Sequence, residues 1–194
     1  QVRAMMDDPT NLRLAKAFDP PFILHSSYRP NSFRQTAAKK GKNVIVYEGG
    51  ESSRFDEFAI KQGIEGTIRL MHHLGMISGQ LNKSNVESKH LKKTLWVRAK
   101  VSGMFQKEIN SGDLVKKGQL LGHITDPFGD FKIPVKSTVD GYVIGLNNNP
   151  ILHAGDAMVN IGYKPQSYGK EKKQIFRQIK RAQKRYLNKA TNLK

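Results

Sequence analysis

The spacing of apolar residues changes once along the chain, near Thr94, and this change limits what the sequence can fold into. Before Thr94, apolar residues recur at helical spacing or in short continuous runs, which predicts helices alternating with buried strands. From Thr94 the period is two and glycines recur beside polar turn residues, which predicts short antiparallel strands. The sequence therefore predicts an α/β part followed by an all-β part.

The α/β part carries start and stop signals for its elements. Asp8-Pro9 is typical of a helix start, and Ser32 and Gly41 are typical of the start and end of another helix. The run Val44-Ile45-Val46-Tyr47 is typical of a strand buried on both faces of a parallel sheet. We expect helices at residues 10–18, 33–40 and 55–74 (one or two helices), and strands at residues 22–24 and 44–47.

The all-β part repeats itself weakly. Val101-Ser102-Gly103 is echoed by Val139-Asp140-Gly141, and Ser111-Gly112-Asp113 by Ala154-Gly155-Asp156. Two related halves predict a pseudo-twofold sandwich connected by Gly-Asp turns. We expect four regions: an α/β domain part at residues 1–79, a linker at 80–93, a β module at 94–163 and a basic, helical tail at 164–194.

The net charge of +17 is concentrated in the tail, which carries +10 and leaves +7 for the other residues. Ile175, Ile179, Ala182 and Tyr186 predict an apolar stripe along the tail. The charged face would suit nucleic acid, anionic lipid or an acidic partner, and the stripe would suit docking on the protein itself or on a second subunit of a homo-oligomer. No apolar run is long enough to span a bilayer, and the lack of cysteine fits a cytoplasmic location.

Glu48 is the sharpest candidate for chemistry. It follows the expected strand at 44–47 and opens a glycine loop, Gly49-Gly50, that leaves room for a substrate. We expect desolvation to raise the pKa of its carboxyl towards neutral pH, as a general base requires. The alternative is a carboxylate that caps the loop or pairs with Arg54.

Nine short motifs before Lys164 occur together and in order. They are Phe22-Ile23-Leu24-His25-Ser26, Ser32-Phe33-Arg34-Gln35-Thr36-Ala37-Ala38, Tyr47-Glu48-Gly49-Gly50-Glu51, Arg54-Phe55-Asp56-Glu57, His73-Leu74-Gly75-Met76, Trp96-Val97-Arg98-Ala99, Gly118-Gln119-Leu120-Leu121-Gly122, Asp126-Pro127-Phe128-Gly129 and Ala154-Gly155-Asp156-Ala157. With these motifs the chain resembles the C-terminal part of the succinylglutamate desuccinylase/aspartoacylase family, which are zinc hydrolases of the carboxypeptidase superfamily. The resemblance is most specific from Gly41 to Met76 and covers nearly everything before Lys164.

This resemblance implies a zinc-carboxypeptidase-like α/β domain, a barrel-sandwich β module, and hydrolysis of an amide or ester bond in a small N-acylated amino acid. Glu48 matches the family residue that activates the zinc-bound water and then protonates the leaving nitrogen. Arg34 matches a family residue that holds the substrate's carboxylate, or it is an ordinary surface residue of its helix.

The zinc ligands that the resemblance implies, a His-x-x-Glu pair and a third His, have no match in these residues. His123 and His153 each precede an Asp by three positions, but on strands such pairs point to opposite faces. The sequence opens on Gln1 and not on Met, with no cap or turn before its first residues, so we expect the natural N-terminus to lie before Gln1. The resemblance implies that the zinc ligands lie there too. We therefore expect the chain to be inactive alone.

The β module also allows a reading without catalysis. Its turns resemble those of biotinyl and lipoyl carriers, but Lys132 lacks the residues that surround a modified lysine. We therefore favour an unmodified module. The alternative function is a barrel-sandwich binding module whose basic arm contacts nucleic acid, membrane or an acidic partner.

Overall fold

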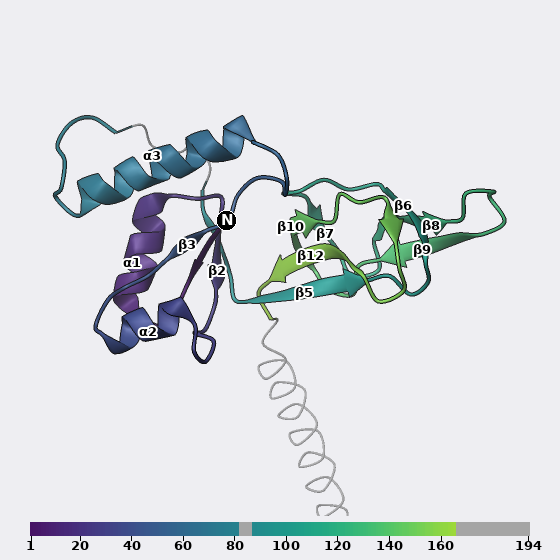
Figure 1. Cartoon of the computed structure of the whole chain (residues 1–194), viewed down its shortest axis with the longest axis horizontal. Helices are drawn as coiled ribbons and strands as arrows, with labels where there is room; N and C mark the ends of the chain where they lie inside the picture. Colours follow the sequence, from purple (N-terminus) through teal and green to yellow (C-terminus); the bar gives the residue numbers. More distant parts are fainter. Residues whose placement is uncertain (82–86, 166–194) are drawn as a thin grey trace, which may run out of the picture. The chain divides into compact units, whose positions relative to one another are not determined.

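The computed structural model describes residues 1–81 and 87–165 (Figure 1). Its described elements form three four-stranded sheets and three helices. In the described ranges, no helix is long and apolar enough to cross a membrane. The tail helix expected at 164–194 lies almost wholly outside the described residues.

The α/β part begins with a parallel β-α-β unit: β1 (Val2–Ala4), α1 (Pro9–Phe18) and β2 (Phe22–His25). It continues with α2 (Phe33–Lys39), β3 (Val46–Tyr47) and α3 (Glu57–His73). The sheet has the order β3-β1-β2-β4, where β4 (Lys89–Leu91) pairs parallel with β2 inside the segment expected to be a linker.

Local signals explain where these helices begin and end. The Asp8 carboxylate accepts hydrogen bonds from the Thr10 and Asn11 backbone N–H groups, and Pro9 opens α1. The Ser32 hydroxyl accepts a hydrogen bond from the Gln35 N–H at the start of α2. The helices predicted at 10–18 and 33–40 are confirmed to within a residue, and the helical spacing over 55–74 corresponds to one helix, Glu57–His73.

The strand predicted at 44–47 differs from the expectation in direction and burial. The regular strand is β3, which has two half-buried residues. It pairs antiparallel with β1 and stands at the end of the sheet order. The prediction of a parallel strand buried on both faces is therefore wrong, because strand direction depends on pairing with β1, more than 40 residues earlier.

A close approach between α1 and α3 fixes the position of α3. The Gly66 backbone lies so near Phe18 that a Cβ atom there would be 2.3 Å from the ring. The Arg69 Nε also donates a hydrogen bond to the Phe18 carbonyl at 3.1 Å. The Phe18 ring further contacts the Tyr47 ring, with 5.2 Å between centroids. Phe18 therefore joins α1, β3 and α3.

The all-β part consists of eight strands in two antiparallel sheets, ordered β5-β12-β10-β7 and β11-β6-β8-β9. The strands are β5 (Lys93–Arg98), β6 (Gly103–Lys107), β7 (Leu114–Val115), β8 (Leu120–Thr125), β9 (Lys132–Lys136), β10 (Gly141–Leu146), β11 (Ile151–Leu152) and β12 (Ala157–Tyr163).

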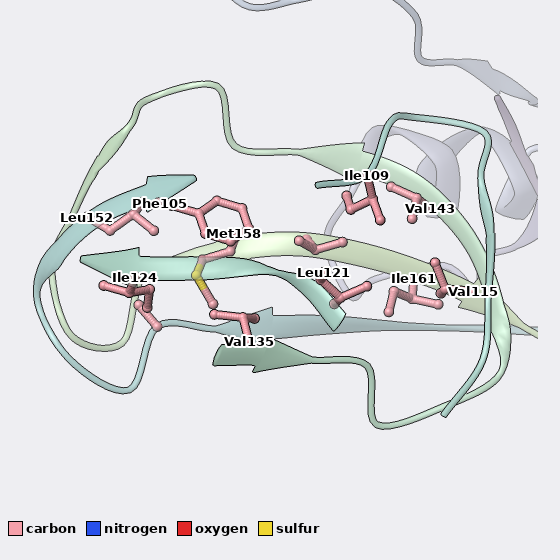
Figure 2. Close-up of a cluster of buried hydrophobic side chains, with 12 residues drawn as sticks. Phe105, Ile109, Val115, Leu121, Ile124, Val135, Val143, Leu152, Met158 and Ile161 are labelled. Carbon is pink, nitrogen blue, oxygen red and sulfur yellow. The ribbon is translucent and has the colours of Figure 1, made fainter. Parts of the chain in front are cut away.

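Side chains from both sheets form one apolar core, which Figure 2 shows. Leu121, Val143 and Ile161 are fully buried in it. Gly122 allows β8 to approach β6, because a Cβ atom there would be 2.2 Å from the Gln106 carbonyl oxygen. The short strands that the period-two pattern predicts are therefore present in this part.

Gly66→Ala tests the contact between α1 and α3. Alanine favours a helix over glycine by about 1 kcal/mol, but the close contact with Phe18 puts the cost of overpacking in the upper part of the usual range, about 2–3 kcal/mol. We expect the free energy of unfolding of the 194-residue chain to fall by about 1–2 kcal/mol in urea denaturation. The control is Thr67→Ala, an exposed neighbour on α3, with an expected change within about 0.5 kcal/mol. A Gly66→Ala chain as stable as wild type would show that this contact is not tight.

Candidate functional site

Glu48 lies directly after β3, at the point where the chain leaves the sheet. Its backbone N–H donates a hydrogen bond to the Gln1 carbonyl, which continues the pairing between β3 and β1. The loop after it leads to Asp56, whose carboxylate accepts a hydrogen bond from the Ala59 N–H and caps α3. Glu48 is therefore held between a strand end and a helix start, as the sequence predicted.

The two glycines after Glu48 have structural reasons of their own. A Cβ atom on Gly49 would be 2.4 Å from the Tyr47 hydroxyl oxygen, so a side chain there would displace the Tyr47 ring. Gly50 has a φ of +86°, in the left-handed region that favours glycine. The Tyr47 hydroxyl donates a 2.8 Å hydrogen bond to the Ala59 carbonyl and so connects the end of β3 to α3.

One oxygen of the Glu48 carboxylate takes two hydrogen bonds. Arg3 Nε donates to Glu48 Oε2 at 2.6 Å, and Gln1 Nε2 donates to the same oxygen at 3.0 Å. Within residues 1–81 and 87–165, Oε1 has no hydrogen-bond partner. The carboxylate is therefore anchored through Oε2, while Oε1 is available to a ligand.

These partners reverse the expected pKa of Glu48. Burial raises the pKa of its carboxyl, but the hydrogen bond and charge of Arg3, with the hydrogen bond from Gln1, lower the pKa by more. The pKa therefore lies below its ordinary value, and the expectation of a raised pKa is wrong. The sequence prediction considered Arg54 as the partner and missed Arg3. The only sequence signal for Arg3 is the apolar-polar-apolar alternation of Val2, Arg3 and Ala4, which is typical of a strand and which the structure shows as β1.

Glu48 lines a cavity of about 560 Å³. Three carboxylates lie on its wall, those of Glu48, Glu51 and Asp56. The all-β part also contributes to the wall, and Asn148 Nδ2 donates a 2.7 Å hydrogen bond to Glu51 Oε1. No Lys, Arg or His is among the described residues that line this cavity, in a chain whose net charge is +17.

Arg34 does not line the cavity of Glu48. Its guanidinium donates to the Ser26 hydroxyl at 2.8 Å and to the Ser26 carbonyl at 3.3 Å, and it lies over the Tyr28 ring. Ser26 N–H in turn donates to the carbonyl of Ala4, the last residue of β1. Glu48 instead hydrogen-bonds to Gln1, which precedes Ala4 by three residues and so lies about 10 Å from it along the strand. The structure therefore holds Arg34 and Glu48 at opposite ends of β1.

The described residues do not form a metal site. Among them, no group of three or more His, Asp or Glu side chains is placed to hold a metal ion. His25 Nδ1 accepts a hydrogen bond from the Met6 N–H, and His123 pairs with Glu108 at 2.8 Å. Glu48 has no second carboxylate or imidazole among its hydrogen-bond partners. These residues therefore do not fit the zinc ion that the sequence resemblance implies.

Comparison with solved structures identifies the fold. The first similar structure is the ectoine utilization protein EutE (DoeB) of Ruegeria pomeroyi, with a TM-score of 0.74 and 20% identity over 84% of this chain and 55% of that one. Another is a succinylglutamate desuccinylase/aspartoacylase of Rhodobacter sphaeroides, with a TM-score of 0.72 and 18% identity over 86% of this chain and 54% of that one. This chain shares their fold.

The resemblance found in the sequence is thus confirmed at the level of the fold. An aspartoacylase family protein of Mesorhizobium loti has the same fold, with a TM-score of 0.65 and 15% identity over 81% of this chain and 48% of that one. The chain spans about half the length of these solved structures. No family model and no curated protein matches the sequence.

Arg3→Met tests the cause of the low pKa of Glu48. Removing the guanidinium leaves burial as the main influence, so we expect the pKa of Glu48 to rise in an NMR titration of its carboxyl carbon. A depressed carboxyl pKa stabilises the fold above the pKa of the unfolded chain, and this stability is lost as pH falls through the folded pKa. Arg3→Met should therefore weaken that acid-range pH dependence.

The matched control for this titration is Arg34→Met, since Arg34 binds Ser26 and not Glu48. It should leave the Glu48 titration where it is in wild type. An Arg3→Met chain with an unchanged or lower Glu48 pKa would contradict the assignment of Arg3 as the partner.

Proposed function

We propose that this chain is part of a hydrolase that cleaves an amide or ester bond in a small N-acylated amino acid or a similar substrate. The observation that carries the proposal is the Glu48 carboxylate, anchored through one oxygen, at the wall of a 560 Å³ cavity in this fold. Cavities of this size bury small molecules. Zinc is part of the proposal and would be held by residues outside these 194, so the chain would be inactive alone.

In this proposal Glu48 moves one proton twice. The ionised carboxylate takes a proton from the water that attacks the scissile carbonyl, and then gives that proton to the leaving nitrogen or oxygen. The lowered pKa keeps Glu48 ionised at neutral pH, ready to accept the proton. Arg3 and Gln1 fix the orientation of the carboxylate through Oε2. Zinc, when bound, would polarise the scissile carbonyl.

Arg34 is still proposed to bind the substrate's carboxylate, but only after a change of its hydrogen-bond partners. Its guanidinium already holds Ser26, so binding a substrate carboxylate would require it to leave these oxygen acceptors. The proposed organisation has residues 1–79 as part of the catalytic domain, 80–93 as a linker that also supplies β4 to its sheet, 94–163 as a barrel-sandwich module and 164–194 as a basic helical tail. A cytoplasmic location belongs to the same proposal.

The second candidate function is a non-catalytic binding module with a basic arm. It is favoured by the apolar core that the two sheets of the all-β part share, and by the lack of a metal-ligand group among the described residues. Binding of nucleic acid or anionic vesicles that disappears on removal of residues 170–194 would support it. Equal binding with and without those residues would exclude a role for the arm.

Glu48→Gln tests the hydrolase proposal in the complete product of the gene, loaded with zinc. Glutamine keeps the size of the side chain but cannot take up the proton, so kcat for an N-acylated amino acid should fall by about 10²–10⁴-fold. The control is Glu57→Gln, in the first turn of α3 outside the cavity lining, which should keep wild-type rates. Full activity of the Glu48→Gln protein on a panel of N-acyl amino acids would overturn the role of Glu48.

A further inference from the structure

The helix α3 has two apolar faces, of which only one is covered. The face toward α1 carries Ala59 and Gly66, small residues that allow Phe18 to approach closely. The opposite side carries Ile60, Ile64 and Ile68, which are 46%, 56% and 41% exposed. Their spacing of four places them in one row along the helix, which we call the isoleucine stripe. A surface helix normally buries its largest apolar side chains, and α3 exposes them.

This exposure is concentrated in one part of the chain. Of the fourteen large hydrophobic residues exposed in the described ranges, eight lie between Phe55 and Ile77. Phe55 and Phe58 are 96% and 72% exposed. Single exposed apolar residues are ordinary on a protein surface, but a continuous group of this kind marks an interaction site. The group therefore needs an occupant.

The isoleucine stripe continues to the edge of the sheet. A hollow of about 160 Å³ is lined by Tyr47 of β3, by Phe55 and by Ile60 at the start of the stripe. Among the described strands, β3 pairs only with β1, so its other edge is open. An open strand edge accepts a further strand through backbone hydrogen bonds. The stripe, the hollow and the open edge therefore form one continuous surface.

We propose that this surface is the seam where a further α/β segment of the same polypeptide, outside these 194 residues, completes the domain. The alignment covers 84% of this chain but only 55% of the EutE chain, so a protein with the whole of that fold would have a further segment to pack against the part found here. An added strand would suit the edge of β3, and an apolar sheet face would suit the isoleucine stripe.

The seam also bears on how the cavity beside Glu48 is completed, an inference that rests on the proposed hydrolase function. Glu48 directly follows β3, so a strand paired with the open edge of β3 would run beside the Glu48 carboxylate. Side chains at the end of that strand would reach the wall of the cavity next to Glu48. The same segment that covers the stripe would therefore also form part of the cavity wall beside Glu48.

Hydroxyl-radical footprinting tests the seam, because it reports the solvent exposure of individual side chains. The 194-residue chain and the complete product of its gene are compared. We expect labelling of Phe58, Ile64 and Ile68 to fall at least about 5-fold in the complete product. Phe128, which is 88% exposed in the all-β part, should be labelled equally in both and serves as the internal control.

The variant Ile64→Lys/Ile68→Lys provides the second measurement. In the complete product it should lower the thermal midpoint and restore labelling of Phe58, whereas in the 194-residue chain the midpoint should stay unchanged, because both residues are exposed there. Phe128→Lys, the matched control, should change neither protein.

Equal labelling of the stripe in the two proteins would overturn the seam. So would a dimer of the 194-residue chain, seen by analytical ultracentrifugation and dissociated by the double variant, since a second copy would then be the occupant.

Loss of the seam and loss of the function give different results. Protection of the stripe in a complete protein that binds no zinc and hydrolyses no N-acyl amino acid would refute the hydrolase and keep the seam. Hydrolysis that depends on Glu48, in a protein whose stripe is fully labelled, would refute the seam and keep the hydrolase.

Discussion

The α/β part depends on Phe18. Its ring fills the space that Gly66 leaves open on α3, contacts the Tyr47 ring of β3, and lies at the end of α1, where its carbonyl accepts the Arg69 hydrogen bond. Tyr47 in turn reaches Ala59 through its hydroxyl. The loop that carries Glu48 runs between β3 and α3, so the position of this carboxylate depends on contacts made by a residue thirty positions earlier.

Local chemistry made much of the fold predictable. Caps at Asp8 and Ser32 are decided by hydrogen bonds over two or three residues, and sequence shows them directly. The strands of the all-β part follow from alternation and glycine spacing. The position of Glu48 at a strand end was also predictable, because the β-branched run before it predicts a strand and the two glycines after it predict a loop.

Pairing between distant segments explains what the sequence did not reveal. The direction of β3 depends on its register with Val2 and Arg3, and nothing within the run 44–47 encodes that register. The same pairing brings Arg3 to Glu48 and turns an expected rise in the pKa of Glu48 into a decrease. Arg34 illustrates the converse: its position on α2 was readable, but its commitment to Ser26 was not.

The pairing of β2 with β4 has a consequence for synthesis on the ribosome. Phe22 of β2 lies opposite Lys89 of β4, so the first sheet is complete only when residues almost seventy positions apart have both emerged. At ordinary elongation rates of about 5–20 residues per second, β2 waits about 3–13 s with one edge unpaired. During that interval β2, whose Ile23 and Leu24 are fully buried in the folded chain, lacks one of its two neighbouring strands, and unpaired strand edges of this kind are prone to aggregate.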